Sequence, residues 1–179
     1  MTAKHQLVQR GRVWCFGDDV MNDGQVMDIE MTRQMVYDPV RLAPLAMGGL
    51  DPSFAAAVRP GDFVVAGHRF GQGPMHIQGP LALAALKVAV LSESMARSFF
   101  RLAVSAGLKV LPFAEGAIEF AAQGDEIEVD FVSGRAINYT SGQEKGFRPL
   151  APAVLELVAA GGEQGWLRQQ APFRSGPQS

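Results

Sequence analysis

The chain has 179 residues, 47% of them hydrophobic and 19% charged, which is typical of a globular domain and not of a disordered segment. Its formal net charge is -2 and no two Lys or Arg residues are adjacent, so the sequence argues against nucleic acid or an anionic membrane as a partner. The single cysteine, Cys15, excludes an internal disulfide and any iron–sulfur or zinc site built on several thiolates of this chain.

The chain carries no pattern that indicates a membrane or secreted protein. The most apolar window, 81–91, is too short to cross a bilayer and contains Lys87, and the N-terminal residues lack the apolar core of a secretory signal. Together with the lone cysteine, these features predict a cytoplasmic protein. We expect one domain over 1–179, with loose ends at about 1–9 and 169–179.

Hydrophobic patterns and turn residues predict an alternation of short strands and helices. In chain order we expect a strand at 12–16, irregular structure over 37–49, a helix at 53–58, a strand at 63–66, a glycine-rich loop, a helix at 80–86, a strand at 88–91, a helix at 95–106, a strand at 109–112, a helical turn within 115–122, a hairpin of 126–131 and 135–139, and a helix at 153–160. This order predicts an α/β fold with a parallel core and antiparallel additions.

Several polar residues have specific predicted roles in these elements. Ser92 or Ser94 is expected to cap the helix at 95–106, and Gly107 to end it. On that helix, Arg97 and Arg101 share one face, which favours a solvated surface over a carboxylate site. Cys15 lies inside the first strand and is expected to be a sheet or core residue and not a reactive thiol.

The glycine-rich loop at 67–80 is the strongest candidate for a binding site. Four glycines, two prolines and the candidate residue His76 follow a strand and precede a helix. Such loops bind small ligands in α/β proteins, because amides at a helix start are unpaired and glycine lets a ligand approach the main chain. The alternative is a simple connector, since glycine and proline mark every turn.

Five segments, in order, resemble the small subunit of 3-isopropylmalate dehydratase, which is similar to the swivelling domain of aconitase. They are RVWCFGDDV (12–20), LDPSFAAAVRPGDFVVAGHRFGQG (50–73), SMARSFFRLAVSAGLKVLPF (94–113), GDEIEVD (124–130) and PLAPAVLELVAAGG (149–162). The resemblance implies a swivelling β/β/α domain with a mostly parallel core sheet, an antiparallel hairpin and flanking helices. It also implies a hydro-lyase reaction on a small hydroxy acid, with an iron–sulfur cluster on a separate large subunit and no cofactor on this chain.

The loop departs from the family pattern where that pattern carries the chemistry. Members of the family have F-G-C-G-S-S-R-E-H-A, in which the first serine is the base and the arginine binds a substrate carboxylate. Here Pro74 replaces the first serine, Met75 the second and His76 the arginine, while Gly71 and Gly73, and in a looser match Pro80, keep the frame. Proline has no proton to exchange, and histidine does not reproduce the two-pronged arginine contact.

Two hypotheses follow from these departures. In the first, His76 is the proton acceptor or anion contact, Met75 is an apolar wall, and Gly71, Gln72, Gly73 and Pro74 complete the substrate-binding loop for a substrate other than isopropylmalate. In the second, the chain has lost catalysis and is a ligand-binding or assembly partner.

A second family motif is kept only in part. Family members have D-T-D before an isoleucine-rich turn, where this chain has Met21-Asn22-Asp23. Asp23 is therefore either a substrate-site residue that orients other groups or a turn cap. The segment 28–33, where the family has its specificity loop, does not identify a substrate.

Overall fold

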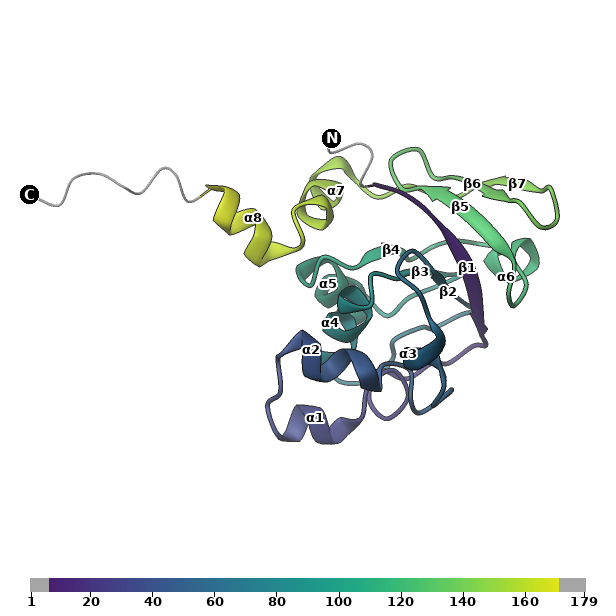
Figure 1. Ribbon diagram of the computed structural model, residues 1–179. Coiled ribbons are helices and arrows are strands. Elements are labelled where there is room, and N and C mark those ends of the chain that lie inside the picture. Colours follow the sequence, from purple (N-terminus) through teal and green to yellow (C-terminus); the bar gives the residue numbers. More distant parts are fainter. Residues whose placement is uncertain (1–6, 171–179) are drawn as a thin grey trace, which may run out of the picture.

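The computed structural model describes residues 7–170, in which one seven-stranded sheet is flanked by helices (Figure 1). The strands are β1 (Val8–Phe16), β2 (Phe63–Ala66), β3 (Ala89–Ser92), β4 (Lys109–Leu111), β5 (Glu126–Asp130), β6 (Arg135–Asn138) and β7 (Glu144–Gly146). The helices are α1 (Ile29–Arg33), α2 (Pro39–Leu42), the 3-10 turn η2 (Ala43–Leu45), α3 (Phe54–Ala57), α4 (Gln78–Ala85), α5 (Arg97–Ser105), α6 (Ala117–Phe120), α7 (Pro152–Ala159) and α8 (Glu163–Gln170). None of these helices is long and apolar enough to cross a membrane.

Strand β1 joins a parallel half of the sheet to an antiparallel half. The strand order is β4-β3-β2-β1-β5-β6-β7. The first half of β1 pairs antiparallel with β5 up to Arg12, and the second half pairs parallel with β2 from Val13 onward. The α/β class with a parallel core is therefore confirmed, and the antiparallel part extends beyond the expected hairpin because β7 adds to β6.

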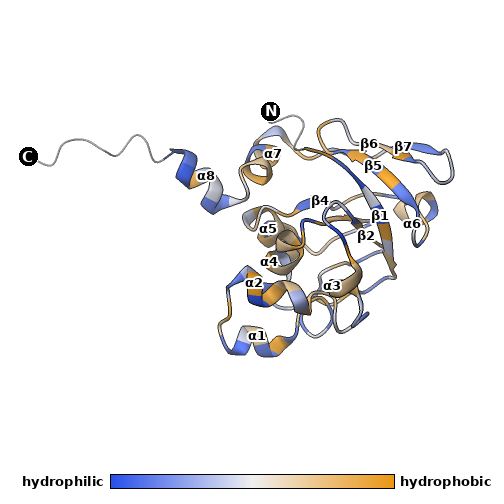
Figure 2. Cartoon of the chain, in the orientation of Figure 1, coloured by the Kyte–Doolittle hydropathy of each residue, from blue (hydrophilic) through white to orange (hydrophobic). Residues whose placement is uncertain are grey.

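The parallel half is buried on both faces, as its sequence predicts. Every residue of β2 and β3 is buried, because α4 and α5 follow these strands and parallel sheets are covered on both sides. Figure 2 shows the contrast with α8, which is coloured mainly as hydrophilic and lies at the edge of the fold beside α7.

A buried carboxylate holds the start of β2 against β1. Asp62 is 5% exposed, and its two oxygens accept hydrogen bonds from the backbone N–H groups of Arg12 and Arg59, at 2.9 Å each, and from the indole of Trp14 at 3.0 Å. Buried carboxylates are stable only with such partners. Asp62 therefore fixes the start of β2 against β1, at the opposite end of the parallel pair from the candidate site.

Most predicted elements are present, but several details were wrong. The stretch 37–49 is not irregular throughout, because Asp38 caps α2 and η2 follows directly. Neither Ser92 nor Ser94 caps α5, whose N-cap is Ala96, whereas Gly107 ends the helix with a φ of 75° as expected. The expectation of loose ends was wrong at 8–9 and 169–170, which belong to β1 and α8, while 1–6 and 171–179 lie outside the described residues.

Candidate functional site

The candidate site consists of two segments that leave neighbouring parallel strands at the same edge of the sheet. The segment 17–23 follows β1, and the glycine-rich loop 67–77 follows β2. Hydrogen bonds join them: the N–H of Asp19 donates to the carbonyl of His68 at 2.9 Å, and the N–H of Asn22 donates to the carbonyl of Gln72 at 2.7 Å. The carboxyl edge of a parallel sheet is the usual place for a ligand.

The first part of the glycine loop faces inward. The N–H groups of Gly71 and Gln72 both donate to the carbonyl of Val20, at 2.7 and 3.1 Å. A Cβ on Gly71 would lie 2.3 Å from the ring of Phe99, so this glycine is required for packing. Gly71 therefore shapes the loop, and its amide is not open to a ligand as we had expected.

The start of α4 is covered, contrary to the expected anion site at a helix N-terminus. Gln78, Gly79 and Pro80 are all buried, and the side chain of Asn22 lies against them. The Oδ1 atom of Asn22 is buried and has no hydrogen-bond partner among the described residues. The prediction of a helix-start anion cradle is therefore wrong for α4.

The tip of the loop, in contrast, is open. Gly73, Pro74 and Met75 are exposed, and the N–H groups of Gly73 and Met75 have no protein acceptor within residues 7–170. Met21, which is 40% exposed, lies beside Gly73, since its Cε would be 3.7 Å from a Cβ at that glycine. Two free amides and two methionine side chains thus form an outward surface of mixed polar and apolar character.

His76 is held at the inner end of this surface by Asp23. Its Nδ1 lies 2.7 Å from Oδ2 of Asp23, and the two side chains are 32% and 13% exposed. A neutral imidazole that donates Nδ1–H to a carboxylate keeps its lone pair on Nε2, and Nε2 has no protein partner in the described part of the chain. This arrangement presents a proton acceptor at the open loop.

Asn22 fixes the backbone on which His76 is placed. Its Nδ2 donates to the carbonyl of His76 at 2.9 Å, while its own side chain is 2% exposed. The space for this side chain exists because residue 79 is glycine: a Cβ there would lie 2.4 Å from Oδ1 of Asn22. Asn22 and Gly79 were not predicted as site residues, and only their contact in three dimensions identifies them.

A second charged group lies at the outer end of the same segments. The guanidinium of Arg69 and the side-chain amide of Gln72 both donate to the carboxylate of Asp19, with Nη2 and Nε2 each 2.7 Å from an oxygen. The hydrogen bonds from Arg69 and then Gln72 lower the pKa of Asp19 from 3.8 to about 2. Gln72 was predicted to bind substrate, whereas Asp19 and Arg69 were not identified from the sequence.

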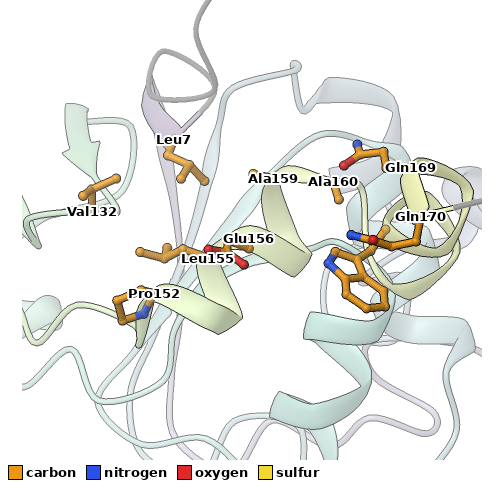
Figure 3. A pocket seen from close by; sticks show the side chains of 10 residues that line it. Leu7, Val132, Pro152, Leu155, Glu156, Ala159, Ala160, Gln169 and Gln170 are labelled. Carbon is orange, nitrogen blue, oxygen red and sulfur yellow. The ribbon is translucent and has the colours of Figure 1, made fainter. Parts of the chain in front are cut away.

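Among the cavities of the described residues, two lie away from the open loop tip formed by Gly73, Pro74 and Met75. One, of about 640 Å³, is polar and is lined by His68, whose Nε2 lies 3.1 Å from Oε2 of Glu93, and by residues of β7. The other, of about 550 Å³, lies between α7 and α8 and is lined by Leu7, Val132 and Trp166 among others (Figure 3). The second cavity is mainly apolar and shares no lining residue with the loop.

The remaining candidates carry no chemistry of their own. Arg97 and Arg101 are exposed on α5, as expected for a solvated face. The Sγ of Cys15 donates to the carbonyl of Ala121 at 3.3 Å, and burial raises the pKa of the thiol. Within residues 7–170, no group of three or more His, Cys, Asp or Glu side chains is placed to hold a metal ion. An iron–sulfur cluster therefore does not fit on this part of the chain.

Comparisons with known proteins find several similar chains and a similar fold. No family model matches the chain. It is 36% identical over 162 residues to the 3-isopropylmalate dehydratase small subunit of Thermodesulfovibrio yellowstonii, covering 90% of this chain and 94% of the relative. It is 40% identical over 154 residues to the methanogen homoaconitase small subunit of Methanothermobacter thermautotrophicus, covering 86% of each. The crystal structure of 3-isopropylmalate dehydratase from Methanocaldococcus jannaschii matches with a TM-score of 0.84 at 30% identity, over 94% of this chain and 98% of that one.

Proposed function

This chain belongs to the family of 3-isopropylmalate dehydratase small subunits and is thus the small subunit of an aconitase-superfamily hydro-lyase; we propose that it works with a large subunit on a small hydroxy acid, with His76 as its proton-transfer group. The observation that carries this proposal is the 2.7 Å contact between His76 and Asp23 on an open loop. The same loop carries the family's base serine, for which this chain has Pro74.

The open loop supports a site that two subunits complete. Met75 is 58% exposed, and the amides of Gly73 and Met75, both exposed residues, have no protein acceptor within residues 7–170. Small-molecule sites normally bury most of their ligand, so a loop this exposed needs another surface to close over it. We assign that surface, and the iron–sulfur cluster that the family relationship implies, to the large subunit. When bound there, such a cluster supplies a Lewis acid for the departing hydroxyl.

This chain's part of the reaction is a proton transfer. Nε2 of His76 accepts the proton from the carbon next to the one that bears the hydroxyl, while Asp23 holds Nδ1 and stabilises the imidazolium. The hydroxyl leaves with the electron pair of its C–O bond, and an alkene remains between the two carbons. In the reverse step hydroxide adds to either carbon while His76 returns its proton to the other carbon, which gives the alcohol.

The residues at the loop tip suggest which substrates fit. Met21 and Met75 place two thioether side chains beside the free amides. Met75 stands at the position of the family's second serine. Apolar walls favour a substrate with an alkyl substituent or fewer carboxylates than isopropylmalate. Because His76 replaces the family's arginine, isopropylmalate itself is not expected to be the preferred substrate.

A test of the proposal is to co-express the chain with the large subunit encoded in the same genome, purify the complex anaerobically, and assay hydration of maleates with different alkyl groups. We expect a stable complex that hydrates alkyl-substituted maleates faster than unsubstituted maleate. A complex with no turnover on any member of the panel would contradict the proposed activity.

A second candidate function, a non-catalytic ligand-binding partner on the same fold, is favoured by two observations. The amides of Gly71 and Gln72 are paired internally, and the start of α4 is buried, so part of the family's anion-binding main chain is closed. Under this alternative the chain would still assemble with the large subunit and bind maleates, but it would not turn them over.

A further inference from the structure

Three N–H donors in the loop converge on one carboxylate. The Nε and Nη2 atoms of Arg69 donate to the two oxygens of Asp19, and Nε2 of Gln72 adds a third hydrogen bond to Oδ1 at 2.7 Å. A bidentate guanidinium with one further amide donor is the arrangement that proteins use to bind a planar carboxylate. Asp19 occupies this arrangement as an ionised carboxylate, since hydrogen bonds from Arg69 and Gln72 hold its pKa at about 2.

The fold does not depend on this ion pair. The side chains of Arg69 and Asp19 are 54% and 57% exposed, and exposed ion pairs contribute little to stability because water screens them. Backbone hydrogen bonds already join the two segments on either side, from Asp19 to His68 and from Gly71 to Val20. Arg69 can therefore exchange Asp19 for another carboxylate without loss of the local structure.

This group lies on the same segment as the partner of the proton acceptor. Val20 and Asn22 are each 2% exposed, whereas Asp19 and Met21 are exposed and Asp23 is partly exposed, so these three residues of the segment reach the surface. Asp19 and Asp23 are four residues apart, at most about 14 Å along the chain. Because Arg69 contacts Asp19 and His76 contacts Asp23, the two groups lie at the two ends of the segment 19–23, which also contains Met21.

We propose that Arg69 and Gln72 form the carboxylate receptor of the substrate site, and that Asp19 is an internal occupant which the substrate's carboxylate displaces. This inference rests on the proposed function and adds its missing element, an anion contact in place of the arginine that His76 replaces. The substrate is then a hydroxy acid with one carboxylate on Arg69, its reacting carbons near His76, and its alkyl group against Met21.

Kinetics of the assembled complex test this assignment with four variants. Arg69→Ala should raise KM at least tenfold with a smaller change in kcat, and Arg69→Lys should restore only part of the loss, because an ammonium cannot make the bidentate contact. Asp19→Asn should lower KM or leave it unchanged, since it frees the receptor. Arg135→Ala is the matched control, because Arg135 forms an equally exposed pair with Glu144 on the hairpin, and it should change neither constant.

A purely structural role for the Arg69–Asp19 ion pair predicts a different pattern of kinetic effects. If Arg69 and Asp19 only tied the two segments together, Arg69→Ala and Asp19→Asn would impair the enzyme alike, and that result would overturn the proposal. An unchanged KM in Arg69→Ala would overturn it as well, even if the complex hydrates its substrate normally and the proposed function stands.

A binding experiment on the full-length chain does not depend on turnover. Succinate is titrated while the NMR signal of the Arg69 Nε–H is followed. We expect succinate to shift this signal in Asp19→Asn at lower concentrations than in the wild type. Absence of any succinate-dependent shift in Asp19→Asn would contradict the assignment of Arg69 and Gln72 as the carboxylate receptor, whether or not the complex is active.

Discussion

His76 and Asp23 lie 53 positions apart in the sequence, yet Nδ1 of the imidazole is 2.7 Å from Oδ2 of the carboxylate. Two sets of hydrogen bonds between these segments produce this contact. The segment after β1 is hydrogen-bonded to the loop after β2, and the Asn22 side chain holds the carbonyl of His76. The dyad is thus positioned by the fold before any substrate binds, which is what a proton-transfer group requires.

Replacement of Asp23 by asparagine is predicted to reduce turnover more than substrate binding. The amide no longer stabilises an imidazolium and no longer selects the tautomer with its lone pair on Nε2. We expect kcat of the complex to fall roughly 100-fold, with KM within about twofold of wild type. Asp38→Asn is the control, since Asp38 is an exposed acid that caps α2. Equal kcat values for Asp23→Asn and Asp38→Asn would exclude the assigned role.

Gly79→Ala is predicted to destabilise the protein and to disturb the His76 loop. The added Cβ would lie 2.4 Å from Oδ1 of Asn22 and 3.0 Å from Cγ1 of Val26, so buried atoms must move. We expect a loss of roughly 1–3 kcal/mol in the free energy of unfolding, measured with urea. Gly146→Ala, where no atom lies within 4 Å of the new Cβ, should stay within about 0.5 kcal/mol of wild type. Similar losses in both variants would argue against the steric account.

Asp62→Ala is predicted to be among the more damaging single substitutions. It leaves three donors, on Arg12, Arg59 and Trp14, without their acceptor at the start of β2. Because an unpaired buried donor costs about 1–3 kcal/mol, we expect a loss of about 3 kcal/mol or more in urea unfolding. Trp14→Phe removes only one of these donors and should cost less. A loss below that of Trp14→Phe would contradict the role given to Asp62.

The Asp19 carboxylate should make a pH-dependent contribution to stability in the acid range. Its folded-state pKa, about 2, is below the ordinary value of 3.8, so the folded protein binds fewer protons than the unfolded chain between these values. The stabilisation is therefore fully present above pH 3.8 and is lost as the pH falls through 2. The difference in unfolding free energy between wild type and Asp19→Asn should shrink from pH 5 to pH 2. A difference that does not change with pH would show that Asp19 keeps its ordinary pKa.

Much of the fold follows from local sequence. The strand at Phe63–Ala66 and the hairpin were predicted because an unbroken apolar run and an alternating run between turns have few other structures available. Short elements such as α2 and β7 were missed, since a turn of helix or three strand residues leave almost no periodic signal. Helix α8 was also missed, because its polar sequence resembles a tail.

The candidate site was predictable only in part. His76 and Asp23 were identified because they stand in motifs that the family resemblance marks. Their contact was not predicted, and neither was the pairing of the Gly71 amide with Val20, because each joins segments far apart in the chain. Arg69 carried a usable signal, an arginine within the glycine-rich loop, but its partner Asp19 became visible only in the structure.

The most direct test of the account is the turnover of the purified two-subunit complex with His76→Gln, compared with wild type on the best alkyl-substituted maleate. His68→Gln is the matched control, because His68 also pairs with a carboxylate, that of Glu93, but outside the dyad. We predict that kcat falls at least roughly 100-fold in His76→Gln and is unchanged in His68→Gln. Full turnover by a correctly assembled His76→Gln complex would contradict the central claim that this histidine performs the proton transfer.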